Sequence, residues 1–274
     1  MTTFLLQLSD LHIRAPGKLA YGRIDTAQYL KRAIDSILRL PQQPDAVVIT
    51  GDLTDFGQAP EYDHLRELLA PLPMPVYLMP GNHDARSQMR RSFADHSYLG
   101  SSGFMQFSVP VGYLQLIALD TVNTGASAGF LCAERLAWLE KELRTHANRP
   151  VIIAMHHPPF QTLIGHMDAI GLLQGAAELE ALVTQYPNVE RVICGHLHRS
   201  IQVRFGGSIA ATAPSPAHQV CLDLSAQAAS MWTLEPPGFV LHALPASGRL
   251  VSHGVASGQY DGPYPFYEAG QLIH

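Results

Sequence analysis

Residues 46–57 read AVVITGDLTDFG, an apolar run that gives way to a polar loop at Gly51 and Asp52. Apolar and β-branched residues at 46–50, bounded by a glycine, are typical of a strand that is buried on both faces. Such strands belong to sheets that are covered on both sides, and ligands bind at the carboxyl ends of their strands. The stretch therefore predicts an α/β fold with Asp52 at the edge where a site would form.

The same pattern, an apolar strand that ends in a polar motif, occurs four more times along the chain. The motifs are Asp10-Leu11-His12 after residues 4–8, Gly81-Asn82-His83-Asp84 after residues 75–79, His156-His157 after residues 151–155, and Gly195-His196-Leu197-His198 after residues 191–194. Helical spacing occurs at residues 25–40, 61–70, 133–145 and 175–186, with Asp25 as the expected N-cap of the first helix. Because the carboxyl ends of strands in an open α/β sheet lie at one edge, we expect the five motifs to converge.

The side chains in these motifs are carboxylates, imidazoles and one amide oxygen, a ligand set that suits Fe, Mn, Zn or Co better than Ca. There are too many donors for one tetrahedral ion, so the set predicts two metal ions that share one carboxylate. Pairs of metal ions about 3.5–4 Å apart recur in phosphoester hydrolysis. A water that bridges such ions becomes hydroxide near neutral pH and attacks phosphorus in line.

Each motif also has an ordinary structural interpretation. Gly51-Asp52 is a common turn after a strand, residues 81–84 fit a type I′ turn, and the paired histidines could be loop or core residues. Short motifs taken singly carry a high false-positive risk. Five motifs that each follow an apolar strand make coincidence improbable, so the joint pattern favours a metal site.

The order D-x-H, GD, GNHD, HH and GH-x-H resembles the calcineurin-like metallophosphoesterase superfamily. Within it, the chain is similar to the bacterial class III phosphodiesterases, which include glycerophosphodiesterases and cyclic-AMP phosphodiesterases. Residues 21–25 (YGRID), 165–170 (GHMDAI) and 217–220 (AHQV) are most similar to the glycerophosphodiesterase branch. The resemblance implies a four-layer αββα sandwich of two mixed sheets flanked by helices, with a dimetal site at one edge.

The resemblance also implies a role for each matched residue. One metal ion would bind Asp10, His12 and His198, the other would bind Asn82, His156 and His196, and Asp52 would bridge them. His83 would contact the phosphoryl oxygen or protonate the leaving alkoxide, so His83, Asp52 and Asn82 form the expected catalytic set. Arg23 and His218 occupy positions that resemble substrate-facing ones, although an aromatic residue is more usual at position 23.

Three neighbouring residues have roles that the pattern leaves open or assigns to structure. Asp84 could orient His83 or could form a turn or helix cap. His157 is expected to be structural, because its neighbour is the matched ligand. Asp55 could support a histidine ligand, but the sequence favours a turn or cap role for it.

The expected function is hydrolysis of small phosphodiesters, of the glycerophosphodiester type, by a hydroxide that bridges two metal ions. The alternative is a 3′,5′-cyclic nucleotide phosphodiesterase with the same metal site, since only the walls of the pocket would separate the two. A non-catalytic scaffold on this fold is less expected, because such proteins have typically lost ligands and here every ligand position is filled.

Composition limits the partners and the location. The chain has 274 residues, 47% of them hydrophobic, and a net charge of −5, which disfavours a nucleic-acid polymer as a partner. Cys132, Cys194 and Cys221 are scattered without a CxxC pair, which favours a reducing, cytoplasmic setting. The N-terminus is interpreted as a core strand and not a signal peptide. No apolar run reaches the ~18 residues of a membrane span, so no membrane partner is expected.

The expected organisation is a catalytic core in residues 1–200, followed by residues 201–274 as a sheet continuation with a cap or dimerisation segment and a C-terminal arm. The apolar stretch 225–240 could be a lid over the site or a subunit contact, and the second is favoured, so a homo-oligomer is possible. Residues 259–270 (QYDGPYPFYEAG) are expected to pack on the body as an ordered arm.

Overall fold

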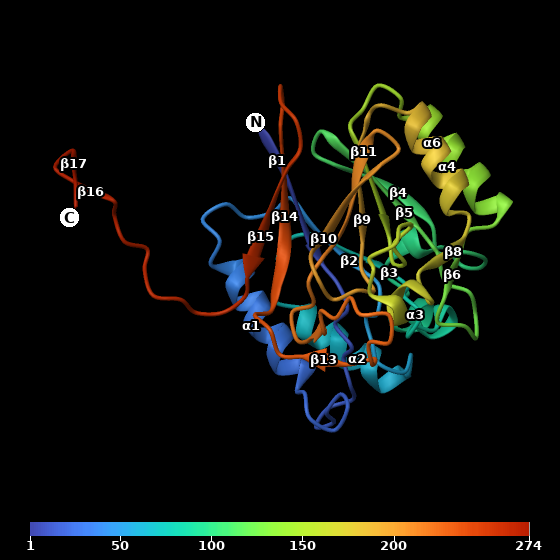
Figure 1. Ribbon diagram of the computed structural model, residues 1–274, viewed down its shortest axis with the longest axis horizontal. Coiled ribbons are helices and arrows are strands. Elements are labelled where there is room, and N and C mark those ends of the chain that lie inside the picture. The colour runs from blue at the N-terminus through green and yellow to red at the C-terminus, as the bar shows by residue number, and fades with distance from the viewer. Residues whose placement is uncertain (274) are drawn as a thin grey trace.

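The computed structural model describes residues 1–273, and two β-sheets packed face to face form its centre (Figure 1). The first sheet has five strands in the order β15-β14-β1-β2-β3. Its parallel strands are β1 (Thr2–Leu8), β2 (Ala46–Thr50) and β3 (Val76–Met79), and its antiparallel strands are β14 (Gly238–Pro245) and β15 (Val251–Ala256). All five residues of β2 are buried, which confirms the two-sided burial expected of residues 46–50.

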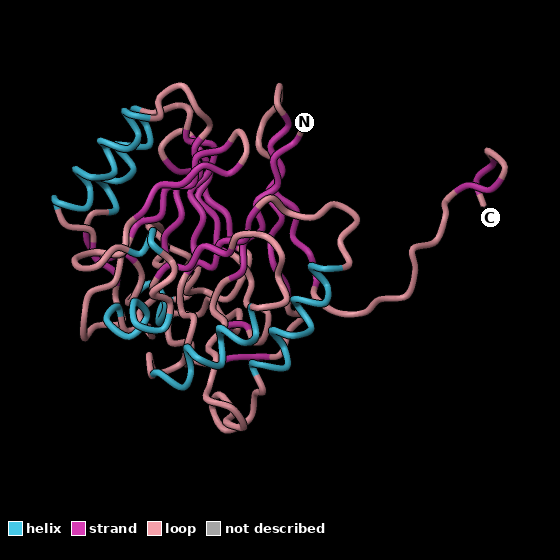
Figure 2. The backbone as a smooth tube through the Cα atoms, turned by 180° about the vertical axis from the view of Figure 1, so that it is seen from behind, coloured by secondary structure: helices cyan, strands magenta, loops and turns pink. Residues whose placement is uncertain are grey.

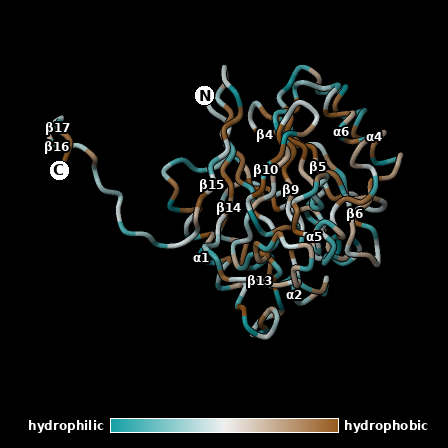
Figure 3. Tube along the Cα trace, in the orientation of Figure 1, coloured by the Kyte–Doolittle hydropathy of each residue, from teal (hydrophilic) through white to brown (hydrophobic). Residues whose placement is uncertain are grey.

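The second sheet has six strands in the order β10-β11-β9-β7-β5-β4. The inner strands β5 (Leu114–Leu119), β7 (Val151–Met155), β9 (Val189–Cys194) and β11 (Ser208–Thr212) are parallel, and the edge strands β4 (Phe107–Val111) and β10 (Ile201–Phe205) are antiparallel. Strands from beyond residue 200 therefore lie in both sheets, β10 and β11 in the second and β14 and β15 in the first. Figure 3 shows hydrophobic residues concentrated in the central strands, β5 and β9 among them.

Helices cover the outer faces of both sheets (Figures 1 and 2). α1 (Thr26–Leu38) and α2 (Ala59–Leu69) lie on the first sheet, and α4 (Ala133–Thr145) and α6 (Ala176–Gln185) lie on the second. The Asp25 side chain accepts a hydrogen bond from the Gln28 amide at 3.0 Å, so the expected cap of α1 is confirmed. Alternate residues of β1 point to opposite layers, because Leu6 packs with α1 and α2 while Leu5 packs between the sheets. The molecule is thus a four-layer αββα sandwich.

The remaining elements are short and lie in the loops. They are α3 (Arg86–Ser92), a 3₁₀ turn at Ser97–Leu99, β6 (Gly129–Phe130), α5 (Gly165–Asp168), β8 (Leu172–Gln174), β12 (Gln219–Val220), β13 (Trp232–Thr233), β16 (Tyr267–Glu268) and β17 (Gln271–Leu272). No helix in residues 1–273 is long and apolar enough to cross a membrane.

The C-terminal segment differs from the expectation. Residues 259–270 were expected to pack on the body, and this prediction is wrong, because the chain after Gly258, which is hydrogen-bonded to Ser36, runs clear of the sandwich (Figures 1 and 2). Its side chains are almost all exposed, including Tyr264 and Phe266. Glycines and prolines interrupt this segment and prevent it from continuing β15 along the sheet edge.

Candidate metal centre

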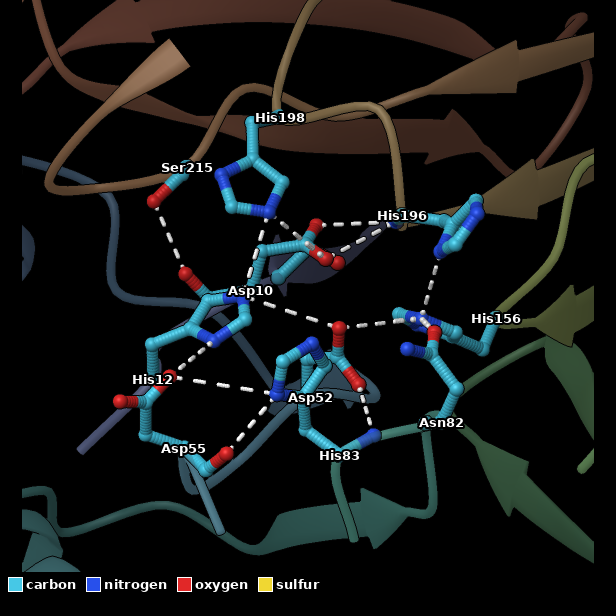
Figure 4. Close-up of polar contacts among 12 residues, drawn as sticks. Asp10, His12, Asp52, Asp55, Asn82, His83, His156, His196, His198 and Ser215 are labelled. Atoms are coloured by element: carbon cyan, nitrogen blue, oxygen red, sulfur yellow. Dashed lines mark hydrogen bonds and ion pairs between the residues drawn. The ribbon is translucent and has the colours of Figure 1, made fainter. Parts of the chain in front are cut away.

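The five polar motifs lie in loops at one edge of the two sheets, directly after β1, β2, β3, β7 and β9. Figure 4 shows their side chains pointing toward a common centre. The carboxylates and imidazoles of Asp10, His12, Asp52, His156, His196 and His198 are all buried. The sequence expectation that these motifs converge is therefore confirmed by the geometry.

The first group of donors comes from the β1 and β9 loops. His12 Nε2 lies 3.2 Å from His198 Nε2, and His198 Nε2 lies 3.5 Å from Asp10 Oδ1. Asp52 Oδ2, from the β2 loop, is 3.6 Å from His12 Nε2. These donor atoms face one another across a gap of a size that one ion would fill.

The second group comes from the β3, β7 and β9 loops. His156 Nε2 lies 3.0 Å from the amide oxygen of Asn82 and 3.3 Å from His196 Nδ1. The same Asp52 Oδ2 that faces His12 lies 3.3 Å from His156 Nε2. Asp52 therefore stands between the two groups, at the place of a shared ligand.

The protonation pattern of the rings fits metal ions at this centre. Nδ1 of His198 lies 3.0 Å from the carbonyl oxygen of His218, and Nδ1 of His156 lies 2.8 Å from that of Thr50. A carbonyl oxygen only accepts, so each Nδ1 carries a proton and Nε2 of each ring faces the centre, where its lone pair can bind a metal ion when the ring is neutral. The ring nitrogens that face each other here are 3.2–3.3 Å apart, so each pair needs a cation, either a proton or a metal ion, between its two nitrogens. The donor set therefore fits two cations.

Buried charge makes the centre attractive to cations. Burial opposes a charge on His156, but Asp52 and Asp10 outweigh it and raise the pKa of His156 to about 9. Burial, with a smaller effect of the neighbouring His156, lowers the pKa of His196 to about 3. The negative charges of Asp52 and Asp10, which favour a proton on His156, would also favour a metal ion in place of that proton.

Five residues of the centre have backbones in the left-handed region. Their φ angles are 55° at Asp10, 46° at His12, 49° at Asp52, 71° at His196 and 52° at His198. Such conformations are uncommon outside glycine and cost about 1–3 kcal/mol each, and they gather at functional sites. Close packing adds to the constraint, because a Cβ at Gly81 would overlap the Asp52 carboxylate.

Comparisons with known proteins agree with this geometry. Residues 5–200 match the family model described as calcineurin-like phosphoesterase. The chain belongs to the calcineurin-like phosphoesterase family. Members of this family use a dinuclear metal site, which agrees with the His and Asp groups described above.

Relatives of this phosphoesterase align along nearly its whole length. It is 38% identical over 270 residues to a probable glycerophosphodiester phosphodiesterase, GpdQ, of Arcobacter nitrofigilis, covering 98% of this chain and 99% of that protein. It is also 38% identical over 262 residues to a probable cyclic nucleotide phosphodiesterase of Rhodopseudomonas palustris, covering 93% of each. A dimetal phosphatase from Danio rerio shares its fold with a TM-score of 0.69 at 16% identity, over 93% of this chain and 96% of the other.

His83 lies beside the centre of the phosphoesterase and faces outward. Its Nδ1 donates to the carbonyl oxygen of Asp55 at 2.8 Å, and its backbone N–H donates to Asp52 Oδ1 at 2.9 Å. Its side chain is 36% exposed and lines the cavity above the centre. The ring is therefore fixed at Nδ1 and open at Nε2, the nitrogen that would meet a substrate.

The structure corrects the role that the sequence favoured for Asp55 and gives a role to Asp84, which the sequence left open. Asp55 accepts from His12 Nδ1 at 3.2 Å and from Arg14 at 2.8 Å, while α2 begins after Gln58, so the turn or cap role favoured for Asp55 is wrong. Asp84 accepts from the amides of Leu53 and Gly81 and from the Tyr62 hydroxyl, and so ties the two loops together.

His157 is held on both sides of its ring, as expected of a structural residue. Its Nδ1 lies 2.8 Å from the Thr121 hydroxyl oxygen, and its Nε2 lies 3.0 Å from the carbonyl oxygen of Ser127. Burial, the largest cause, and the neighbouring His156 keep its pKa well below the usual range. The ring therefore has no free nitrogen to offer a metal ion.

A cavity of about 430 Å³ opens above the centre. His218 is among the lining residues, and the Nδ1 atom of this buried ring has no hydrogen-bond partner within residues 1–273. Arg23 is not among the lining residues in the described part of the chain, because the tight turn between Ala20 and Ile24 leaves it exposed to solvent. Tyr21, two residues earlier in that turn, lines the cavity instead.

Sequence reasoning missed the aromatic wall of this cavity. Tyr21 stacks on Trp232 of β13 with ring centroids 5.8 Å apart and planes 22° apart, and both rings contact His218. The YGRID segment pointed to this turn but to the wrong residue, and the apolar stretch 225–240 contains Trp232. Within residues 1–273, no Lys or Arg lines the cavity.

Proposed function

We propose that this chain is a dinuclear metal-dependent phosphodiesterase that hydrolyses small diesters of the glycerophosphodiester type. The observation that carries the proposal is the pair of donor groups that share Asp52 Oδ2, beneath a cavity without a cationic side chain. The family membership and the name of the Arcobacter nitrofigilis relative support it.

The proposed ligands follow the two groups. Asp10, His12 and His198 would hold one ion, Asn82, His156 and His196 would hold the other, and Asp52 would bridge them. Two ions bound there would supply a water of lowered pKa and would neutralise charge on the phosphoryl oxygens. We leave the metal open among Fe, Mn, Zn and Co, since mixed oxygen and nitrogen ligands accept all four.

The chain's own residues would then position the substrate and move one proton. His83, anchored at Nδ1 by the Asp55 carbonyl, can direct Nε2 at the leaving oxygen and donate a proton to it. His218 can offer its unpartnered ring nitrogen to the substrate. Asp52 Oδ1 accepts a hydrogen bond from the His83 backbone N–H, which fixes the position of His83 relative to the Asp52 carboxylate.

The charge of the cavity wall favours diesters over monoesters. A diester carries one negative charge, which the metal ions can neutralise, whereas a monoester dianion gains from additional Arg or Lys contacts. Within the described chain, the lining offers aromatic, apolar and imidazole groups and no such cation. The volume of about 430 Å³ suits a small substrate.

The second candidate is a 3′,5′-cyclic nucleotide phosphodiesterase. The observation that favours it is the stacked pair of Tyr21 and Trp232 at the cavity wall, because a nucleobase can stack against such a surface. The Rhodopseudomonas palustris relative bears the corresponding name.

We also propose a cytoplasmic location and a homo-oligomeric state. All three cysteines are free, which agrees with a reducing compartment. Exposed apolar side chains at Leu222, Leu224 and Met231 support a contact between subunits.

The test is metal content and turnover before and after chelation, with each of the four metals added back. We expect about two metal ions per chain. We also expect chelator-sensitive hydrolysis of bis(p-nitrophenyl) phosphate that is faster than that of p-nitrophenyl phosphate. Comparing kcat/KM for glycerophosphoethanolamine and 3′,5′-cyclic AMP then separates the two candidates. Bound metal without turnover on any diester would contradict both.

A matched pair of variants ties the activity to the site. Asn82→Ala removes the amide oxygen that faces His156 and should lower metal content and abolish most turnover. Asn148→Ala changes an exposed asparagine in the loop after α4 and should alter neither. Full turnover in the Asn82 variant would refute the assignment of the second metal group.

A further inference from the structure

A second cavity, of about 760 Å³, lies beside α3 and is called the α3 cavity below. Its wall comes from the helix and from the 3₁₀ turn and loop that follow it, as far as Ser101. It has no lining residue in common with the cavity above the metal centre. A ligand in the α3 cavity would therefore occupy a site of its own, away from the two groups of metal donors.

The wall of the α3 cavity is positively charged. Arg90 and Arg91 line it, and no Asp or Glu in the part of the chain that the structure describes does so. Asp95 lines the next cavity instead, and its two oxygens accept hydrogen bonds from Arg66 at 2.6 and 2.7 Å. Guanidinium groups and hydroxyl groups together suit an anion with several oxygen atoms. The hydroxyl groups available in this lining belong to Ser87, Ser97 and Ser101.

Neither arginine of the α3 cavity has its charge neutralised within residues 1–273. Nε and Nη2 of Arg91 donate to the side-chain oxygen of Gln88, which is a neutral group. Two positive charges on adjacent residues repel, and an anion between them would remove that cost. The arginines of the described chain that do form ion pairs with a carboxylate are others, namely Arg14, Arg66, Arg86, Arg144 and Arg199.

Arg90 also shapes the loop that closes the α3 cavity. Its Nε and Nη2 donate hydrogen bonds of 2.9–3.3 Å to the carbonyl oxygens of residues 99, 100, 102 and 103. Four carbonyl groups of one short loop therefore point toward this guanidinium, whose Nη1 has no partner within residues 1–273. The backbone N–H of Ser101 has no partner among the same residues. The loop thus turns its acceptors inward and leaves donors available to a ligand.

An apolar cavity adjoins the α3 cavity and gives room for an organic group. It has a volume of about 440 Å³, and it shares Phe93, His96 and Ser97 with the α3 cavity. Met74 and Tyr77 are among its other lining residues. An anion that is bound by the two arginines can therefore carry an apolar or aromatic substituent into this space.

We propose that the α3 cavity binds a phosphate dianion, either free or as a monoester whose organic part enters the adjoining apolar cavity. A dianion gains from both guanidinium groups, whereas the single charge of a diester gains less from the second one. The lining of the cavity above the metal centre has no Lys or Arg within residues 1–273, so the two cavities favour opposite charge states. A monoester is also what hydrolysis of a diester releases, and only this link to the product rests on the proposed function.

The experiment is calorimetric titration of the metal-loaded protein with inorganic phosphate at about pH 8, where the second proton of phosphate is largely lost. We expect one binding step at the α3 cavity and one at the metal centre. Arg91→Ala removes a guanidinium and Ser101→Asp adds a carboxylate, and each should weaken the first step about 10-fold. The control is Arg204→Ala, which changes the net charge equally at an exposed position of β10 and should leave both steps unchanged.

The Asn82→Ala variant separates the two steps. It should weaken only the step at the metal centre, and a failure there bears on the proposed function and not on the α3 cavity. Phosphate binding that is unchanged in both Arg91→Ala and Ser101→Asp would overturn the proposal. Complete loss of phosphate binding in Asn82→Ala would overturn it as well, because all of the phosphate would then bind at the metal centre.

A second probe, phenylphosphonate, distinguishes a monoester from free phosphate. Its C–P bond is not a phosphate ester and is not hydrolysed, so the enzyme leaves it intact during the titration. If its ring enters the apolar cavity, it should bind about 10-fold more tightly than inorganic phosphate in the step that Arg91→Ala weakens. Equal affinity of the two probes in that step would assign the α3 cavity to free phosphate.

Discussion

Replacing Asp55 tests whether the group behind His12 sets the affinity for metal. The Asp55 carboxylate is 5% exposed, accepts from His12 Nδ1 at 3.2 Å, and is held by Arg14 at 2.8 Å. It does not line the cavity. Its removal should therefore act on the orientation and basicity of His12 and not on the substrate.

The magnitude follows from what each substitution removes. Losing the partner of a metal-bound histidine typically costs about 10–100-fold in affinity, or about 1.4–2.7 kcal/mol. Asp55→Asn keeps an oxygen that can accept from His12 and loses only the charge, so about 10-fold is expected. Asp55→Ala loses both, so about 100-fold is expected. His83 contacts the backbone carbonyl of Asp55, and both variants keep that bond.

The assay is calorimetric titration of the chelated protein with Mn²⁺ or Zn²⁺, together with turnover at saturating metal. The metal affinity of one of the two binding steps should fall in Asp55→Asn and should fall further in Asp55→Ala. Turnover at saturating metal should be largely retained in both variants. Asp95→Asn, which breaks an exposed pair with Arg66, is the control and should leave both steps unchanged. Unchanged affinity in a folded Asp55→Ala protein would refute the reasoning.

Three further predictions concern other residues. His83→Gln should lower kcat by about 10²–10⁴-fold for alkyl diesters, with less effect on p-nitrophenyl esters, whose leaving group needs no proton, while metal content measured by mass spectrometry stays the same. Trp232→Ala should raise KM for cyclic nucleotides more than for glycerophosphoethanolamine if the aromatic wall stacks a base, and equal effects would contradict that role. Burial, with a smaller effect of Arg191, lowers the pKa of His242 to about 3, below its ordinary 6.5, so its stabilising effect is complete above pH 6.5 and is lost as the pH falls toward 3. At pH 5 the loss is about 2 kcal/mol, and His242→Gln should reduce the acid dependence of the unfolding free energy by that amount in urea titrations.

The sequence predicts well which side chains meet at the centre, because two local rules apply to them. Apolar runs identify the buried strands, and the polar residue that follows each run must lie at the carboxyl edge. Asp52 and His156 meet at 3.3 Å for this reason, although about a hundred residues separate them.

The cavity wall could not be predicted in the same way. Whether Tyr21 or Arg23 reaches it depends on the φ angle of 50° at Tyr21, which no residue pattern shows. Trp232 comes from a two-residue strand in a stretch without a clear period. Asp55 has the appearance of a turn residue until the fold brings His12 to it from 43 positions away.

The strained loops explain how the centre can be arranged by the protein itself. Five of the seven proposed ligands adopt left-handed conformations that are individually unfavourable. Hydrogen bonds between the loops offset this cost, since Asp10 N–H donates to Gly51, His12 N–H donates to Asp52, and His196 N–H donates to the Asp10 carboxylate at 2.9 Å. Asp10, His12 and His196 are thus each held by a loop other than their own. These bonds between loops arrange the donor groups in advance, and such preorganisation lowers the cost of binding.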